Sequence, residues 1–176
     1  MVYKFTKSAE KVMDISKEIA TNLGHSYIGT EHILYGLAKE KNSISNKVLE
    51  KQNINEKKIL EKIEDIIGSN IFLEKYTIGF TPRAKRVIEN AFNESKKLNS
   101  DYIGTEHLLI GIINESDSIA GRILYELETD ISKLYKQLVK ILNDIEKEDF
   151  INTNNKIKDN ISQNLKHFGS DLTRKS

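Results

Sequence analysis

Residues 27–32 read Tyr-Ile-Gly-Thr-Glu-His, and residues 102–107 read the same six letters. The two hexapeptides are 75 residues apart in a chain of 176 residues. Self-similarity at a fixed offset indicates that one structural unit occurs twice. We therefore divide the sequence into two copies of one unit, residues 5–68 and 80–143.

A second pair of matching segments opens each copy. Phe5-Thr6 and Phe80-Thr81 are separated by the same offset. A phenylalanine followed by a threonine is typical of a helix start, with the ring packing as a staple and the hydroxyl capping the first turn. Pro82 then occupies the first helical position, where its missing N–H costs no hydrogen bond.

Each copy is predicted to form four helices, because apolar residues recur at intervals of three and four. No alternating pattern is long enough to predict a sheet. A unit of about 64 residues has a marginal core, so we expect the two to pack as one all-α domain of eight helices with pseudo-twofold symmetry. The predicted helix caps are Thr6 and Thr30 in the first copy, and Thr81 and Thr105 in the second. The third helix is expected to follow Ser43 or Ser118, and the fourth to run from about Asn55 to Ile67 or from Thr129 or Asp130 to about Lys147.

The composition changes near the end of the second copy. We assign residues 1–148 to the double-repeat domain and residues 149–176, rich in Asn, Lys and Asp, to a flexible linker. The last residues look like the beginning of a further domain. We expect this protein to be monomeric, because no long apolar seam remains outside the predicted cores.

Charge and motifs exclude several classes of function. Lys and Arg number 27 and Asp and Glu 26, a balance that argues against nucleic-acid binding. There is no cysteine and no apolar run of the roughly 20 residues that would span a bilayer, so we expect a cytoplasmic protein. No phosphate-loop motif for ATP and no catalytic motif is present. His25 and His32 belong to different predicted elements, which makes a metal site improbable, and His32 and His107 are expected to close the first turns of their helices.

The repeated hexapeptide also contains an acidic residue in each copy, Glu31 and Glu106. The positive end of the helix dipole stabilises a carboxylate in the first helical turn, and this alone would explain a glutamate at each position. The alternative is that each carboxylate binds a cation while helix N–H groups and the hydroxyls of Thr6 and Thr81 bind an anion. Such a pair of sites would suit a ligand that carries both charges.

The two Phe-Thr pairs and the two Gly-Thr-Glu-His-[Ile/Leu]-Leu strings resemble the N-terminal domain of Clp ATPase unfoldases of the ClpC type. The opening of the second copy, Phe-Thr-Pro-Arg-Ala-Lys, also resembles this family. The resemblance as a whole covers residues 3 to about 145. The final Phe-Gly-Ser-Asp-Leu-Thr is similar to the approach to the first ATPase module of these proteins.

The resemblance implies a domain that recruits substrates and adaptors of the MecA/McsB type to an unfolding ring that feeds a ClpP-type protease. It also implies a reader of arginine-phosphorylated proteins, with Glu31 and Glu106 binding the guanidinium and Thr6 and Thr81 the phosphate. ATP would bind only in ATPase modules outside this chain, so we expect no cofactor here and no catalysis.

Two alternatives remain open. The chain could be a docking domain for adaptors alone, with a surface near Phe80, Arg83 and Lys85, or a stand-alone regulator built from this domain. The family pattern is not matched everywhere, since Asn99-Ser100-Asp101 replaces the usual Gly-His-Asn or Gly-His-Ser. We therefore do not expect equal affinity at the two sites.

Overall fold

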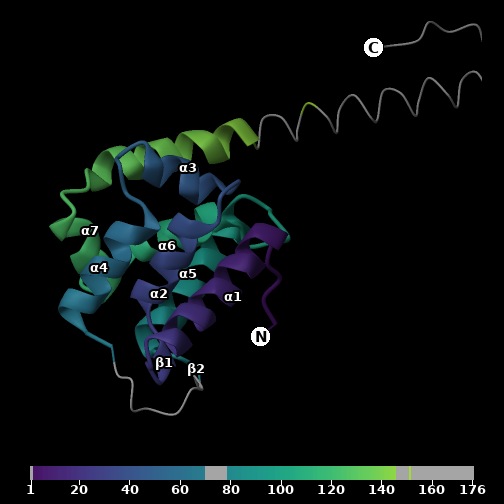
Figure 1. Ribbon diagram of the computed structural model, residues 1–176. Coiled ribbons are helices and arrows are strands. Elements are labelled where there is room, and N and C mark those ends of the chain that lie inside the picture. The colour runs from purple at the N-terminus through teal and green to yellow at the C-terminus, as the bar shows by residue number, and fades with distance from the viewer. Residues whose placement is uncertain (1, 70–78, 146–150, 152–176) are drawn as a thin grey trace, which may run out of the picture. The chain divides into compact units, whose positions relative to one another are not determined.

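The computed structural model describes residues 2–69, 79–145 and 151, and its chain divides into two compact units, 1–138 and 139–176. The first unit contains all the named elements, and Figure 1 shows its helices gathered around α2 and α6. Residues 131–138 of this unit are also helical, as are residues 139–145 of the second unit. The named helices are α1 (Lys7–Asn22), α2 (Thr30–Lys39), α3 (Ile44–Glu50), α4 (Glu56–Ile66), α5 (Pro82–Lys97), α6 (Thr105–Asn114) and α7 (Ile119–Glu126).

The prediction of an all-α fold made of two four-helix repeats is therefore confirmed for the described residues. Helices α1 to α4 form the first repeat, and α5 to α7 with the helix that begins at residue 131 form the second. Most of the predicted linker, residues 149–176, lies outside the described residues. Among the helices described, none is both long and apolar enough to cross a membrane.

The first helix of each repeat begins as the sequence predicts. The hydroxyl of Thr6 accepts a hydrogen bond from Ala9 N–H at 3.2 Å, and that of Thr81 accepts from Ala84 N–H at 3.1 Å. The first helix then ends at a left-handed residue, Gly24 in the first repeat.

The caps of α2 and α6 differ from the prediction. Gly29 and Gly104, not Thr30 and Thr105, are the N-cap residues, and both have extended backbone. The threonines are the first helical residues, so their hydroxyls do not cap their own helices.

Instead, these hydroxyls join the two repeats. Thr30 Oγ1 accepts a hydrogen bond from Ala120 N–H at the start of α7, at 3.1 Å, and Thr105 Oγ1 accepts from Ser45 N–H at the start of α3, at 3.4 Å. Each repeat therefore satisfies an N–H in the first turn of a helix of the other, where helices lack internal partners. This exchange is a direct sign of the pseudo-twofold packing.

Two short parallel pairings join the repeats in the same reciprocal way. Strand β1 (Tyr27–Ile28) pairs with β2 (Gly79–Phe80), and Phe5 forms an isolated parallel bridge with Ile103. Figure 1 shows β1 and β2 side by side near one end of the helices. The sequence did not predict any sheet, and the reason is length: two residues cannot produce an alternating pattern.

Candidate functional site

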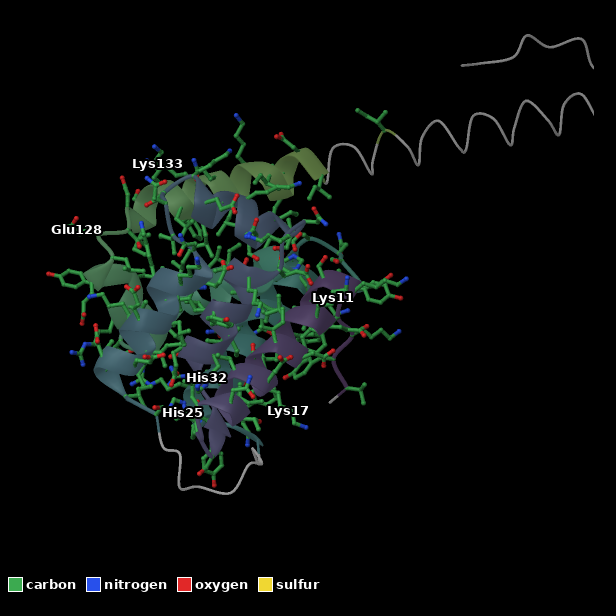
Figure 2. All side chains as sticks on the ribbon, viewed as in Figure 1. Lys11, Lys17, His25, His32, Glu128 and Lys133 are labelled. Atoms are coloured by element: carbon green, nitrogen blue, oxygen red, sulfur yellow. The ribbon has the colours of Figure 1, made fainter. Side chains whose placement is uncertain are left out.

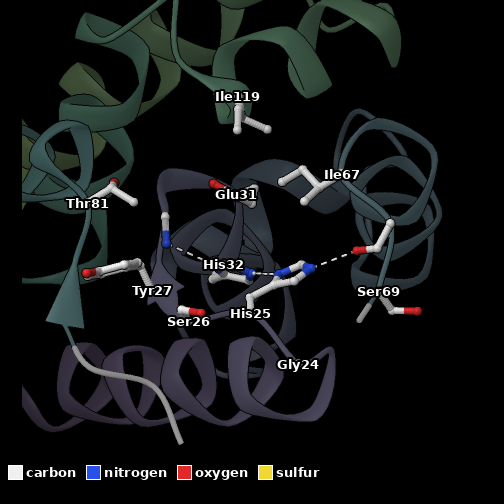
Figure 3. Close-up of a pocket in the computed structure, with 12 residues that line it drawn as sticks. Gly24, His25, Ser26, Tyr27, Glu31, His32, Ile67, Ser69, Thr81 and Ile119 are labelled. Atoms are coloured by element: carbon white, nitrogen blue, oxygen red, sulfur yellow. Dashed lines mark hydrogen bonds between the residues drawn. The ribbon is translucent and has the colours of Figure 1, made fainter. Parts of the chain in front are cut away.

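The N-terminal end of α2 opens into a pocket of about 490 Å³. This volume lies within the range of about 300–1,000 Å³ that small-molecule sites occupy. Figure 3 shows Glu31 near the centre of the view, with Thr81 on one side, Ile67 on the other and Ile119 above it. The remaining lining residues are Gly24, His25, Ser26, Tyr27, Gly29, His32, Gly68 and Ser69.

This pocket brings together two predicted site residues from different repeats. Glu31 belongs to the first repeat, and Thr81 caps α5 in the second. The backbone connects the two places directly, because Thr81 N–H donates to Ile28 O at 2.9 Å. The candidate site is therefore composite, and neither repeat alone contains it.

Glu31 is a buried carboxylate, with only 5% of the residue exposed. Within the described residues, no lysine or arginine forms an ion pair with it or with Glu106. Burial raises the pKa of Glu31, although a hydrogen bond from its own backbone and the nearby His25 lower it in part. Burial also raises the pKa of Glu106. In the part of the chain that the structure describes, both carboxylates thus lack a lysine or arginine partner, and a bound cation could take that place.

The glycine two residues before each glutamate is explained by this arrangement. A Cβ added to Gly29 would lie 2.7 Å from Glu31 Cδ, and one added to Gly104 would lie 2.7 Å from Glu106 Cδ. The backbone torsions at both glycines are accessible to any residue (φ −100° and −97°). A side chain at either glycine would therefore displace the carboxylate, because the carboxylate folds back over the glycine.

The histidine of each hexapeptide closes the same turn. Gly29 N–H donates to His32 Nδ1 at 2.8 Å, and Gly104 N–H donates to His107 Nδ1 at 2.9 Å. This confirms the structural role predicted for both histidines. The repeated Gly-Thr-Glu-His string is thus one turn in which glycine makes room, threonine reaches the other repeat, and histidine holds the backbone.

The helix that meets Glu31 in the pocket provides donors for an anion. In α5, Pro82 has no N–H and Ala84 N–H is bonded to Thr81 Oγ1, which leaves Arg83 N–H without an intrahelical acceptor. The Thr81 hydroxyl can still donate its own proton. A carboxylate and a helix N-terminus therefore face the same pocket.

The second pair of predicted residues is brought together by the matching contacts. Thr6 N–H donates to Ile103 O at 2.9 Å, three residues before Glu106. Helix α1 has no proline at its start, so Lys7 and Ser8 both have an N–H without an intrahelical acceptor. This end offers an anion two backbone donors, whereas α5 offers one.

One contact in the pocket was not predicted. His25 Nδ1 lies 2.8 Å from His32 Nε2, and His25 Nε2 lies 2.7 Å from Gly68 O. Figure 2 shows both labelled histidines at the same end of the molecule, and Figure 3 shows the two bonds. The histidines belong to different elements, as predicted, but they meet because the loop after α1 turns back onto α2. Within the described residues, no group of three or more His, Cys, Asp or Glu is placed to bind a metal.

The three residues predicted as an adaptor surface fall into two places. Phe80 and Lys85 line a second cavity of about 600 Å³ between α1 and α5. Arg83 instead pairs with Asp117 and lies 3.5 Å from Glu115 in the segment between α6 and α7. The other residues that line the second cavity are Tyr3, Phe5, Glu10, Met13, Asp14, Ile88 and Glu89.

Sequence reasoning missed the residues that complete the first pocket. Ile119 and Ile67 lie far from Glu31 in the sequence and have no motif of their own. Tyr27 also lines this pocket, and the sequence did contain a signal for it, because a tyrosine opens the repeated hexapeptide in both copies. In the structure Tyr27 and Tyr102 are about half exposed (50% and 51%).

The fold and the pocket define a doubled four-helix domain with a composite site at the joint between its repeats. The chain belongs to the family described as the Clp repeat (R) N-terminal domain, whose model matches residues 4–127 and 79–167. It is 40% identical over 176 residues to a ClpA homolog, an ATP-binding subunit of an ATP-dependent Clp protease, from Guillardia theta, covering all of this chain and 21% of that protein.

Further similar proteins belong to the same group of Clp proteins. The chain is 41% identical over 142 residues to the negative regulator of genetic competence ClpC/MecB of Bacillus subtilis, covering 81% of this chain and 17% of that protein. The crystal structure of the N-terminal domain of ClpD from Arabidopsis thaliana has a TM-score of 0.67 and 27% identity, covering 81% of this chain and 97% of that one. The chain thus spans about a fifth of the length of the curated relatives it matches.

Proposed function

We propose that this chain recruits arginine-phosphorylated proteins and adaptor proteins to a Clp-type unfoldase that delivers them to a ClpP-type protease. The observation that carries the proposal is the composite pocket, in which a buried carboxylate without a lysine or arginine partner among the described residues faces the N-terminus of a helix. Membership of the Clp repeat family supports the recruiting role.

Phosphoarginine fits the chemistry of this pocket. Its guanidinium would donate hydrogen bonds to Glu31, and its phosphate would accept them from Thr81 Oγ1 and Arg83 N–H. A phosphate without an adjacent guanidinium, as in phosphoserine, would meet the charge of Glu31 without compensation. An unmodified arginine would leave the helix N-terminus unused. The site is therefore expected to discriminate against both.

The test is a calorimetric titration of phosphoarginine into this protein and into its Glu31→Gln and Glu106→Gln variants. We expect two sites in the unsubstituted protein, and in each single variant we expect one of the two to be weakened. Loss of a charge-assisted hydrogen bond, worth about 1.5–3 kcal/mol, should weaken the affected site roughly 10- to 150-fold. Phosphoserine and arginine serve as control ligands. Full binding by the double variant would exclude this assignment.

A second candidate function is adaptor docking in the cavity between α1 and α5. It is favoured by the phenylalanines of both repeats, Phe5 and Phe80, which line the same cavity with Met13. A pull-down with an adaptor of the MecA/McsB type that survives the double glutamate substitution but is lost in Phe80→Ala would support it. Loss of the adaptor in the glutamate variant alone would count against it.

A further inference from the structure

The first pocket, which Glu31 and Thr81 share, has few donors for a phosphate. A phosphoryl group has three oxygen atoms that accept hydrogen bonds strongly. Among the described residues that line this pocket there is no lysine or arginine. Because of Pro82, the start of α5 offers only the N–H of Arg83, and the Thr81 hydroxyl adds a second donor. A third donor from the same pocket would give the phosphate one donor for each oxygen.

The hydroxyl of Tyr27 is available for this purpose. Tyr27 lines the pocket and is half exposed. Within the described part of the chain, its hydroxyl makes no hydrogen bond and its ring stacks on no other aromatic ring. The next residue of β1, Ile28, is only 4% exposed, so the strand turns one side chain into the core and the other toward the pocket.

The register of the strand pairing puts Tyr27 on the same side as Thr81. Tyr27 lies beside Gly79 of β2, and Thr81 N–H donates to Ile28 O at 2.9 Å. Side chains two residues apart along an extended segment point to the same face, so Thr81 shares the face of Gly79 and therefore that of Tyr27. Figure 3 shows Tyr27 and Thr81 on one side of the pocket and Ser69 on the other.

Packing against the neighbouring strand does not explain the tyrosine. Aromatic residues are favoured in strands, and an aromatic ring can cover a glycine of the next strand. A Cβ added to Gly79 would meet no atom of the described residues within 4 Å, so the Tyr27 ring does not cover this glycine. The second copy has a similarly exposed tyrosine, Tyr102, although Lys4 stands there at the position of Gly79. A covered glycine is therefore not what the two tyrosines have in common.

We propose that Tyr27 is a phosphate-binding residue of the first pocket, whose hydroxyl donates a hydrogen bond to the phosphoryl group of phosphoarginine. The guanidinium end of the ligand is bound by Glu31. The phosphate end accepts from Thr81 Oγ1, Arg83 N–H and Tyr27 Oη. The hydroxyl selects phosphorylated over unmodified arginine, because only the phosphorylated side chain has an acceptor for it. This inference rests on the proposed function, and its test distinguishes the failure of one from the failure of the other.

The test is an NMR titration of phosphoarginine into the unsubstituted protein and into Tyr27→Phe at pH 7.5, with the Arg83 amide reporting the first pocket. The substitution removes the hydroxyl and keeps the ring. Loss of a hydrogen bond to a charged group should weaken this site roughly 10- to 150-fold. Arginine, which has no phosphate, should bind no more weakly to the variant. Full phosphoarginine affinity in Tyr27→Phe, or an equal loss for arginine, would overturn the inference.

A direct readout of the hydroxyl is the carbon-13 resonance of tyrosine Cζ, the ring carbon that carries the oxygen. The Tyr27 resonance, assigned by its absence in Tyr27→Phe, should shift when phosphoarginine saturates the protein. Tyr125 is 82% exposed on α7 and does not line the pocket, so its resonance serves as the control. An unchanged Tyr27 resonance at saturation would overturn the inference, because a tyrosine that only shapes the rim donates nothing to the ligand.

Matched variants isolate the tyrosine from the other hydroxyls of the pocket. Ser26→Ala and Ser69→Ala remove hydroxyls that also line it, and both should retain the phosphoarginine affinity. A loss in either serine variant with full affinity in Tyr27→Phe would assign the third donor elsewhere and overturn the inference alone. Absence of saturable phosphoarginine binding to the unsubstituted protein would overturn the proposed function and this inference together.

Discussion

Neutralising Glu31 should stabilise the free protein, even though it removes a binding group. The residue is 5% exposed and has no lysine or arginine partner among the described residues, and burial raises its pKa. A buried polar group that is not fully compensated costs about 1–3 kcal/mol in mutational data. The isosteric, neutral glutamine should therefore recover on the order of 1 kcal/mol, which raises Tm by about 2–4 °C for a chain of this size.

The pH dependence of this gain has a definite sign. Because the pKa of Glu31 is raised in the folded state above its ordinary value of 4.5, folding favours the protonated form. Below about pH 4.5 the unsubstituted protein is therefore as stable as the Glu31→Gln variant. It loses stability relative to that variant as the pH rises through the folded-state pKa of Glu31. Glu31→Gln should match it near pH 4 and exceed it at pH 7.5.

Thermal and urea unfolding at these two pH values measure the effect. Glu115→Gln is the matched control, because Glu115 is equally buried (4% exposed) but pairs with Arg86 at 3.1 Å and Arg83 at 3.5 Å. Removing a charge from such a pair should lower Tm. A lower Tm for Glu31→Gln at pH 7.5, as in the control, would mean that the Glu31 carboxylate is not destabilising and would identify it as a structural cap.

Three further outcomes are expected. Gly29→Ala should displace the Glu31 carboxylate and abolish phosphoarginine binding at that site in calorimetry, with an unchanged circular dichroism spectrum; unaffected binding would contradict the close fit. Thr30→Val should lower the free energy of unfolding by about 1 kcal/mol in urea, since Ala120 N–H loses its acceptor, and an unchanged midpoint would show that this contact is not stabilising. Because the pKa of His32 is lowered to about 3, the unfolded state binds more protons below about pH 6.5, so stability should fall as the pH drops from 6.5 to 5, by up to about 1.4 kcal/mol per pH unit from this residue. A His32→Gln variant with the same pH slope would argue against that source.

The helices could be predicted from the sequence because their signals are local. Apolar spacing and capping side chains such as Thr6 and Thr81 act within a few residues, and they located the helix starts closely. The caps of α2 and α6 were misassigned for an equally physical reason. The hydroxyl of Thr30 bonds 90 residues away to Ala120, and no local pattern records that contact.

The residues of the candidate site could be predicted from the sequence, but which threonine lies beside which glutamate could not. The exact repetition of the hexapeptide singled out Glu31 and Glu106, and the Phe-Thr pairs singled out Thr6 and Thr81. Which threonine meets which glutamate depends on the strand pairing between repeats, and strands of two residues leave no sequence signal. The contact of His25 with α2 was missed because it depends on the path of a loop.

The proposed function depends on each site being formed by residues of both repeats. A crystal structure of this protein with phosphoarginine would test this directly. We expect the guanidinium within about 2.7–2.9 Å of the Glu31 carboxylate while the phosphate accepts from Thr81 Oγ1 and Arg83 N–H, and a second molecule between Glu106 and Thr6. Phosphoarginine held by residues of one repeat only, or bound away from both glutamates, would show that the sites are not shared in this way.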